Sequence, residues 1–327
     1  MNILLTGGAG YIGSHVVLSL LDGGNKVTII DNLISGNKEI LPENINFYNC
    51  NINNKEKIKE IIHSSNFDVL MHFAGFIKVE ESVSNPKKYF ENNTINSITL
   101  FETCLENNLK NIIFSSTAAV YGSPKNNKPI SENELLQPLN PYGESKMKSE
   151  NYLLKNKDKL NSIILRYFNV AGADSKLRAG LISDEATHLI KIISEVAVGK
   201  REKILVYGND YQTADGTAIR DYIHVSDLAD IHVEAAKYLL KDHQSNIFNC
   251  GYGKGYSVLD VINEANIITN GKIKFEFSKR RPGDSENLVS NVSKISKHIN
   301  WKPKYDNLKE IIESSINWEK KLNEKNL

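Results

Sequence analysis

The chain of 327 residues lacks the features that mark disulfide-stabilised, metal-binding and membrane proteins. Its three cysteines, Cys50, Cys104 and Cys250, are widely spaced and form no CxxC or Cys/His metal pattern. We therefore expect reduced structural thiols, no metal site and a cytoplasmic location. No apolar run approaches membrane-spanning length, and a first strand expected at residue 2 or 3 leaves no room for a signal peptide.

The chain also lacks a net charge of either sign, because its formal charge is +1. This balance gives no overall field for nucleic acids or membrane surfaces, and we expect neither as a partner. A few local basic residues must therefore meet any anionic ligand. The length allows two domains, or one large α/β unit with an appended lobe.

A glycine-rich turn, Thr6–Gly13, is present at the N-terminal end. It follows the apolar run Ile3–Leu5 and precedes a helix-like stretch, Ile12–Leu21, that ends at two glycines. Gly7, Gly10 and Gly13 permit a tight turn and close backbone approach, while the helix N-terminus directs N–H groups at phosphates. No Walker lysine follows, which disfavours a nucleoside triphosphatase. The pattern predicts a dinucleotide site.

The next predicted strand, Val27–Ile30, is followed directly by Asp31. A carboxylate at this position can accept hydrogen bonds from the adenosine ribose hydroxyls and would repel a 2′-phosphate. The sequence therefore favours NAD over NADP.

Short apolar segments alternate with helix-length segments along the first half. We predict strands at Val69–Phe73, Ile112–Phe114 and Ile163–Tyr167 and helices at Asn92–Glu106 and Tyr142–Leu154. This is the pattern of a doubly wound parallel sheet of Rossmann type. We assign residues 1–170 to a dinucleotide-binding domain and 171–327 mainly to a smaller α/β substrate-binding lobe. Segments around 217–250 are expected to return to the main sheet.

Catalytic residues are indicated by Tyr-x-x-x-Lys, which occurs at Tyr121/Lys125, Tyr142/Lys146 and Tyr305/Lys309. A glycine and a proline interrupt the first pair, and the third is remote from the glycine turn. In the second pair, Pro141 suits the first turn of a helix, and the i, i+4 spacing puts both side chains on one face. We predict Tyr142 as acid/base, with Lys146 lowering its pKa and Thr117 supplying a hydroxyl to the same substrate oxygen.

Together these motifs resemble the extended short-chain dehydrogenase/reductases and, among them, the UDP-glucose 4-epimerases. The likeness covers nearly the whole chain. Its main matching stretches are Thr6–Ser14, Asp31–Leu33, His72–Gly75, Pro141–Lys146, Leu165–Asn169, Gly208–Tyr211, Asp215–Thr217 and Ile219–Val225.

The resemblance implies a mechanism without net redox change. Tyr142 takes the proton of the sugar 4-hydroxyl while a hydride passes from C4 to tightly bound NAD. The 4-keto sugar turns about its link to the diphosphate, and the hydride returns to its opposite face. A homodimer is also implied.

The resemblance also assigns binding residues. Arg220 and Arg281 would bind the diphosphate, Asp284 the uridine ribose, and Asn169 the phosphate or sugar. The complete substrate set is Thr117, Tyr142, Asn169, His188, Leu189, Tyr207, Arg220, Arg281, Asp284 and Leu288. The cofactor set is Gly7, Gly10, Tyr11, Ile12, Gly13, Asp31, Asn32, Asn51, Ile52, Phe73, Ala74, Gly75, Asn92, Ser115, Tyr142, Lys146 and Tyr167. Without the family, Arg220 is equally explained as an ion-pair partner of Asp221.

Some positions depart from the family pattern. Asn51 replaces a carboxylate that binds adenine, and Ile77 replaces a lysine, with Lys78 one residue later. His188 stands where an asparagine often contacts UDP. Leu288 occupies the position of a tyrosine that limits the sugar pocket in some relatives, which leaves room for an N-acetyl group.

Three alternatives therefore stay open. UDP-N-acetylglucosamine or both sugars are possible substrates of a 4-epimerase, and pentose nucleotides also stay open. A dehydratase is disfavoured, because Ala118 and Ala119 stand where those enzymes place an Asp-Glu pair. A non-catalytic NAD-binding regulator is the alternative from a different class.

Overall fold

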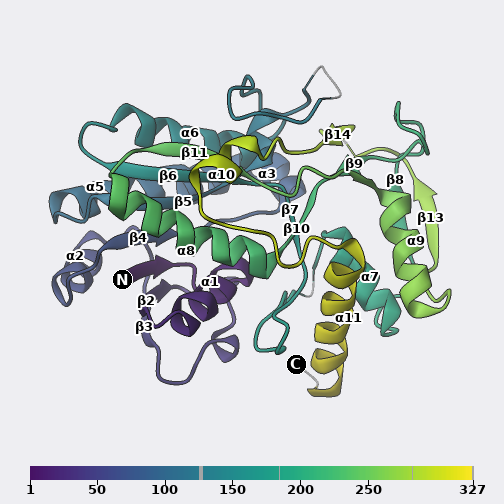
Figure 1. The fold of residues 1–327 in the computed structure, drawn as a ribbon, viewed down its shortest axis with the longest axis horizontal. Coiled ribbons are helices and arrows are strands. Elements are labelled where there is room, and N and C mark those ends of the chain that lie inside the picture. The colour runs from purple at the N-terminus through teal and green to yellow at the C-terminus, as the bar shows by residue number, and fades with distance from the viewer. Residues whose placement is uncertain (125–127, 184, 282, 326–327) are drawn as a thin grey trace.

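A computed structural model describes residues 1–124, 128–183, 185–281 and 283–325. Its centre is a seven-stranded sheet in the order β11-β6-β5-β4-β1-β2-β3 (Figure 1). All neighbouring strands in this sheet are parallel. The strands are β1 (Asn2–Thr6), β2 (Lys26–Asp31), β3 (Asn46–Asn49), β4 (Val69–His72), β5 (Asn111–Thr117), β6 (Asn161–Tyr167) and β11 (Asn246–Cys250). The doubly wound parallel sheet predicted from the sequence is confirmed.

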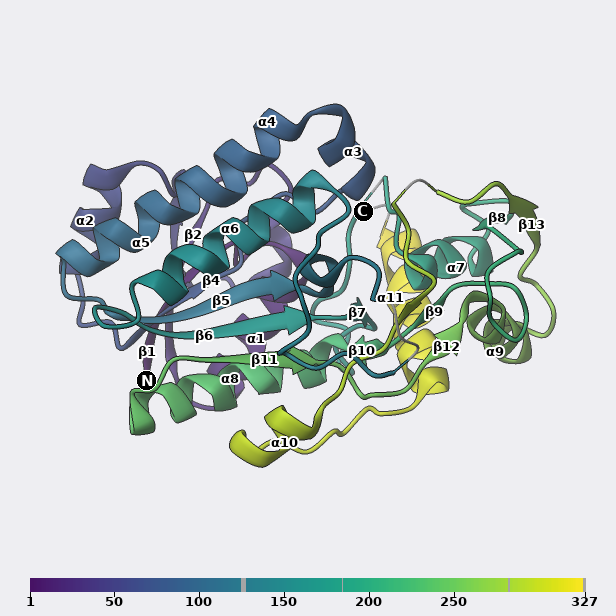
Figure 2. The ribbon, with the colours of Figure 1, turned by 90° about the horizontal axis from the view of Figure 1, so that it is seen from above.

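Helices cover both faces of this sheet, which explains why its central strands are continuously apolar. Figure 2 shows α1 and α8 on one face and α2, α5 and α6 on the other. Leu4 and Leu5 are both fully buried, and they belong to hydrophobic clusters on opposite faces. The covering helices are α1 (Tyr11–Asp22), α2 (Lys55–His63), α5 (Asn96–Glu106), α6 (Pro141–Lys155) and α8 (Val225–Asp242).

The predicted helix Asn92–Glu106 was placed too late in the chain. Helical structure begins at Pro86, and α4 (Pro86–Tyr89), a π-helix (Phe90–Ile95) and α5 follow without a break. The Asn85 side chain caps this start by accepting a hydrogen bond from the Lys88 N–H. Proline at the first helical position is favourable because its missing N–H would have no helical partner. A short helix, α3 (Val79–Ser84), precedes it.

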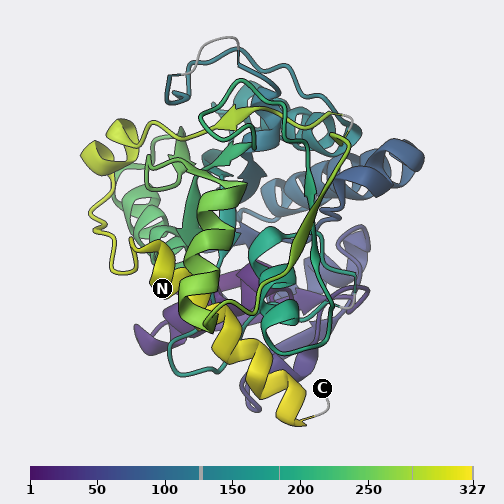
Figure 3. The ribbon, with the colours of Figure 1, turned by 90° about the vertical axis from the view of Figure 1, so that its right-hand side faces the viewer.

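The remaining strands form three small sheets at the carboxyl ends of the main strands (Figures 1 and 3). They pair as β10-β7, β12-β9-β14 and β13-β8. Their bounds are β7 (Asn169–Ala171), β8 (Ile204–Tyr207), β9 (Ile219–Arg220), β10 (Tyr222–His224), β12 (Tyr256–Ser257), β13 (Phe275–Ser278) and β14 (Asn287–Leu288). The helices of this part are α7 (Leu189–Ala197), α9 (Val258–Thr269), α10 (Ser293–His298) and α11 (Leu308–Lys325).

The chain crosses between the two parts more than once. α8 packs on α1, and β11 pairs with β6 in the main sheet. β9 and β10, which precede α8, belong to the small sheets instead. Two 3₁₀ turns, Lys38–Ile40 and Ala118–Tyr121, complete the regular structure. In the part of the chain that the structure describes, no helix is both long and apolar enough to cross a membrane.

Candidate active site

The glycine turn joins β1 to α1 with very little space around it. Gly7 has a φ of +74°, and a Cβ added there would lie 2.5 Å from the Ala74 nitrogen. A Cβ added to Gly13 would lie 2.2 Å from the Gly7 oxygen. Gly10 is the N-cap residue of α1 and makes no side-chain cap. The first N–H groups of α1 therefore have no side-chain partner, which is the arrangement that receives a diphosphate.

Asp31 lies at the end of β2, beside this turn. Its carboxylate accepts hydrogen bonds from the Ala9 N–H at 3.0 Å and the Leu33 N–H at 2.8 Å. Burial raises the pKa of Asp31, while the two N–H groups oppose that rise. Asn32 follows it. The glycine cradle and a carboxylate at this strand end fit the diphosphate and adenosine ribose of NAD.

Asn51 and Ile52 follow the neighbouring strand β3. The Asn51 side-chain oxygen accepts a hydrogen bond from the Asn53 N–H at 3.3 Å, and Ile52 is buried. The Asn51 side chain therefore stabilises the turn that it begins. The segment after β3 begins beside Asp31, because the Cys50 N–H donates to the Asp31 carbonyl at 3.2 Å.

The predicted catalytic side chains come together at the ends of β5 and α6. Thr117 is the last residue of β5, its hydroxyl accepts from the Ala119 N–H at 3.2 Å, and it lies near enough to Tyr142 to lower the pKa of that phenol. Pro141 is the first residue of α6, and the Asn140 side chain caps this helix by accepting from the Gly143 N–H. Local sequence thus starts the helix one residue before Tyr142 and directs this tyrosine at Thr117.

Lys146 lies one turn further along α6 and is 3% exposed. Its Nζ donates a hydrogen bond to the Ser115 carbonyl at 2.9 Å and lies 5.0 Å from the centre of the Phe114 ring. Burial lowers the pKa of Lys146 to about 8. This lysine is therefore held between the strand end and the helix.

Burial and Thr117 act on the pKa of Tyr142 in the structure. Burial raises the pKa of the Tyr142 phenol, and the hydrogen bond from Thr117 opposes the rise. Thr117 is the neighbour that lowers the pKa of this phenol, while the Lys146 ammonium group donates to the Ser115 carbonyl. Of the other Tyr-x-x-x-Lys pairs, Tyr305 stacks on His224, and Lys125 lies outside the described residues.

The loop after β4 passes directly above Lys146. A Cβ added to Gly75 would lie 3.3 Å from the Lys146 Nζ and 3.2 Å from the Asn93 Oδ1. Phe73 and Ala74 precede it, and the Phe73 ring packs on His232. This loop, Ser115 and Tyr167 therefore surround the position where a nicotinamide would meet Tyr142.

Asn93 holds this loop, a role that the sequence did not reveal. Its side chain accepts from the Phe76 N–H at 2.8 Å and donates to the Phe76 carbonyl at 2.9 Å. Its carbonyl accepts from the Ser149 hydroxyl of α6 at 2.8 Å. The predicted residue, Asn92, only donates to Asn93. The π-helix turns Asn93 inward, and no local sequence pattern predicts a π-turn.

A buried ion pair lies behind the catalytic strand. The Arg166 guanidinium on β6 contacts the Glu150 carboxylate of α6 at 2.6 Å, and both side chains are at most 2% exposed. The Ser116 hydroxyl donates to the same carboxylate. This pair ties α6 to β5 and β6 and so fixes the helix that carries Tyr142.

The predicted phosphate-binding arginines lie in the C-terminal part and are already paired. Arg220 contacts the Asp284 carboxylate at 2.5 Å and donates to the Ser285 carbonyl at 2.7 Å. The alternative pair with Asp221 does not form. Asp221 is fully buried and accepts instead from the N–H groups of Tyr252 and Gly253, both at 2.9 Å.

Arg281 is held by an aromatic ring and a carboxylate. Its guanidinium lies 3.8 Å from the centre of the Tyr207 ring, and its Nε is 3.3 Å from a Glu80 carboxylate oxygen. Glu80 belongs to α3 and is 68% exposed. This contact therefore joins the C-terminal part to the loop region that follows β4.

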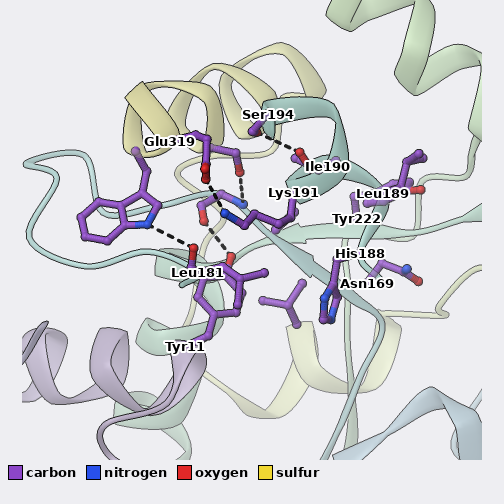
Figure 4. A pocket seen from close by; sticks show the side chains of 15 residues that line it. Tyr11, Asn169, Leu181, His188, Leu189, Ile190, Lys191, Ser194, Tyr222 and Glu319 are labelled. Carbon is purple, nitrogen blue, oxygen red and sulfur yellow. Dashed lines mark hydrogen bonds and ion pairs between the residues drawn. The ribbon is translucent and has the colours of Figure 1, made fainter. Parts of the chain in front are cut away.

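A small cavity of about 30 Å³ adjoins the predicted substrate residues Asn169, His188 and Leu189. Figure 4 shows Tyr11 and His188 beside it, together with the buried ion pair between Lys191 and Glu319. This volume is enough for one or two water molecules. Leu288 lies elsewhere, against the cluster of Ala118, Val120, Tyr121, Ile130 and Phe168.

Comparisons with known proteins identify the family of the chain. A family model described as "NAD dependent epimerase/dehydratase family" matches residues 3–251. A curated UDP-glucose 4-epimerase from Azospirillum brasilense is 44% identical over 98% of this chain and 92% of its own length. A second, from Halalkalibacterium halodurans, is 44% identical over 98% of this chain and 96% of its own length.

Solved structures of similar proteins cover the whole fold. A UDP-glucose 4-epimerase from Stenotrophomonas maltophila with bound NAD and formylated UDP-arabinopyranose has a TM-score of 0.95, 32% identity and 99% coverage of both chains. One from Bifidobacterium longum in complex with NAD⁺ and UDP has a TM-score of 0.91, 34% identity and 98% coverage of both chains. The chain therefore belongs to the UDP-glucose 4-epimerases and is an NAD-dependent isomerase.

Proposed function

We propose that this protein interconverts UDP-glucose and UDP-galactose through a transient 4-keto sugar. The observation that carries the proposal is the meeting of Thr117, Tyr142 and Lys146 beside the glycine turn. Bound NAD supplies a hydride acceptor and donor for C4 of the sugar. The family membership sets aside the non-catalytic regulator and the dehydratase.

The protein's own residues would handle the proton. Tyr142 removes the proton from the sugar 4-hydroxyl as the C4–H bond breaks, and it returns the proton when that bond reforms on the opposite face. Thr117 has a single hydroxyl hydrogen, which it would donate to the same substrate oxygen. Lys146 would supply positive charge near both groups. Because proton and hydride both return, the reaction has no net redox change.

The cofactor residues would divide between the two ends of NAD. Gly7, Gly10 and Gly13, with the N–H groups at Tyr11 and Ile12, would bind the diphosphate. Asp31 would accept hydrogen bonds from the adenosine ribose, as its strand-end position favours. The adenine end would be completed by Asn32, Asn51 and Ile52, and the nicotinamide end by Phe73, Ala74, Gly75, Asn92, Ser115, Tyr142, Lys146 and Tyr167.

The arginines that would bind the UDP diphosphate now form ion pairs within the protein. Arg220 and Arg281 would bind the diphosphate, so Asp284 and Glu80 would have to move aside or share these arginines. Asp284 would then be free for the uridine ribose. Asn169, His188, Leu189, Tyr207 and Leu288 would complete the sugar and uridine pocket.

The division of labour extends to the whole molecule. We place NAD on residues 1–170 together with α8 and β11, and the nucleotide sugar mainly on the remaining C-terminal segments. A homodimer and a cytoplasmic location complete the proposal. They rest on the family resemblance and on the free buried thiols of Cys50, Cys104 and Cys250. Light scattering on the purified protein tests the dimer.

The decisive experiment uses no added oxidant. The purified protein is incubated with UDP-galactose and, separately, with UDP-N-acetylgalactosamine, and the products are followed by proton NMR. Formation of UDP-glucose supports the proposal. Conversion of the N-acetylated sugar alone would select the alternative substrate, which the names of the curated relatives do not favour. Conversion of neither, with NAD supplied, would contradict the proposed reaction.

A further inference from the structure

His232 is a fully buried histidine of α8 that no part of the proposed reaction uses. Its Nδ1 lies 2.8 Å from the Leu228 carbonyl oxygen, and its Nε2 hydrogen-bonds the Tyr167 hydroxyl. The ring of Phe73 packs against it with centres 4.8 Å apart. Its imidazole therefore touches two residues that the sequence assigns to the cofactor.

The direction of both hydrogen bonds follows from their partners. A carbonyl oxygen only accepts, so Nδ1 of His232 must carry a hydrogen. Burial lowers the pKa of His232 to about 4, so the ring is neutral near pH 7 and its Nε2 carries no hydrogen. The Tyr167 hydroxyl must then donate to Nε2. Its oxygen is left with lone pairs only.

Tyr167 lies at the carboxyl end of the main sheet, next to Thr117. It ends β6, and its Cα is paired in register with Thr117 on one side and Cys250 on the other. The Ser115 side chain lies near enough to oppose the rise that burial causes in the pKa of Tyr167, and the Ser115 carbonyl accepts a hydrogen bond from Lys146. Any ligand group that reaches Tyr167 here meets an acceptor and not a donor.

We propose that His232 is a positioning residue that fixes Tyr167 as a hydrogen-bond acceptor for the carboxamide N–H of the nicotinamide. The carboxamide has one N–H₂ group and one carbonyl oxygen, and only the first can pair with an acceptor. A free tyrosine would bind either end. His232 thereby selects one orientation of the carboxamide. This inference deepens the proposed function and rests on it.

The first test needs no substitution. The intact protein is produced with ¹⁵N-labelled histidine, and the ring nitrogens of His232 are assigned by long-range proton–nitrogen correlation at pH 7. We expect a protonated Nδ1 and an unprotonated Nε2. A protonated Nε2, in either a neutral or a cationic ring, would overturn the inference. This result does not depend on whether the protein epimerises any sugar.

The second test measures NAD retained per protomer after gel filtration. His232→Phe and Tyr167→Phe should each weaken NAD binding about three- to tenfold, the effect of one hydrogen bond. The double variant should be no weaker than Tyr167→Phe alone, because His232 acts only through the Tyr167 hydroxyl. His232→Gln should bind nearly normally, since an amide can donate to Leu228 and accept from Tyr167.

Controls separate this role from simple packing. His63→Phe alters an exposed histidine of α2 and should leave NAD binding unchanged. Additive losses in the double variant, or His232→Gln as weak as His232→Phe, would overturn the inference. If His232→Phe fails to fold, His232→Gln and the NMR measurement still test the positioning role of His232. Normal NAD retention with no epimerisation would contradict the proposed function alone.

Discussion

The two charged regions of the proposed site are organised in opposite ways. On the edge of the main sheet, Lys146 is buried and donates to the Ser115 carbonyl, and Tyr142 already lies beside Thr117. In the C-terminal part, Arg220 forms an ion pair with the Asp284 carboxylate, and Arg281 forms one with the Glu80 carboxylate. The first region is assembled before any ligand arrives. The second is held by internal anions, which a diphosphate would have to replace under the proposed function.

This difference separates chemistry from recognition. A buried acid/base that is already in position needs little rearrangement at the moment of reaction. Its interactions can therefore stabilise the transition state without a cost for reorganisation. An exposed ion pair is worth about 0–1 kcal/mol, so a diphosphate can displace Glu80 from Arg281 at small cost. Substitutions in the first region should therefore change turnover or folding strongly, and those in the second should change KM weakly.

The largest effect is expected from Tyr142→Phe. Loss of the acid/base should lower kcat about 10²- to 10⁴-fold, while UDP affinity stays within a few-fold, because only the hydroxyl is removed. Coupled kinetics and calorimetry measure the two quantities. Tyr305→Phe, in another Tyr-x-x-x-Lys pair, is the matched control and should leave kcat unchanged. A lost UDP affinity in a folded Tyr142→Phe protein would show that the tyrosine binds rather than reacts.

Arg166→Met should have the next largest effect, on stability. It leaves the Glu150 carboxylate buried and unpaired, which costs about 3–5 kcal/mol. Urea unfolding measures this cost. Lys57→Met removes one partner of an exposed ion pair with Glu60 and should cost less than about 1 kcal/mol. Equal losses of unfolding free energy in Arg166→Met and Lys57→Met would contradict the expectation that burial makes the Arg166–Glu150 pair more costly to break.

Lys146→Met should stabilise the protein while abolishing activity. The folded pKa of Lys146 is about 8, below its ordinary value of 10.5, so burying the charged form destabilises the native state at pH 7. One pKa unit corresponds to about 1.36 kcal/mol, which sets an upper limit of about 3 kcal/mol. The gain should shrink as pH rises from 8 to 10.5.

Thermal melts of Lys146→Met at several pH values provide the measurement. Lys148→Met, on the exposed side of the same helix, is the control and should show no such pH dependence. A stability gain for Lys146→Met that stays constant between pH 8 and 10.5 would mean that burial does not destabilise the charged ammonium group.

The smallest effect is expected from Glu80→Gln. Freeing Arg281 from its carboxylate should lower KM for the nucleotide sugar by at most about fivefold and leave kcat unchanged. The advantage should fade at high salt, since exposed charges are screened. Glu276→Gln breaks a similar surface pair with Lys203, far along β13, and serves as the control. A higher KM in Glu80→Gln would mean that the pair helps binding instead.

The sequence predicted those parts of the molecule that local patterns specify. Alternating apolar strands and helices gave the parallel sheet, because each element carries its own periodicity. The spacing of Tyr142 and Lys146, with Pro141 before them, placed both side chains on one helix face. Thr117 followed from its position directly after a strand. Each of these inferences used only neighbours in the chain.

Contacts between distant segments were beyond such reasoning. The pairing of Arg220 with Asp284 joins residues 64 positions apart, while the adjacent Asp221 binds backbone N–H groups. His232 stands among apolar residues of α8, where a histidine is indistinguishable from core packing until Tyr167 is seen beside it. The helix before Asn92 was missed because a π-turn breaks the regular periodicity.

The most direct test of the account follows the hydrogen at C4. UDP-galactose carrying deuterium at C4 is incubated in ordinary water, and the UDP-glucose formed is examined by NMR and mass spectrometry. If the edge of the main sheet performs oxidation and return at C4, the deuterium stays at C4 of the product. Replacement of the deuterium by solvent hydrogen would contradict hydride return and with it the assignment of Thr117, Tyr142 and Lys146.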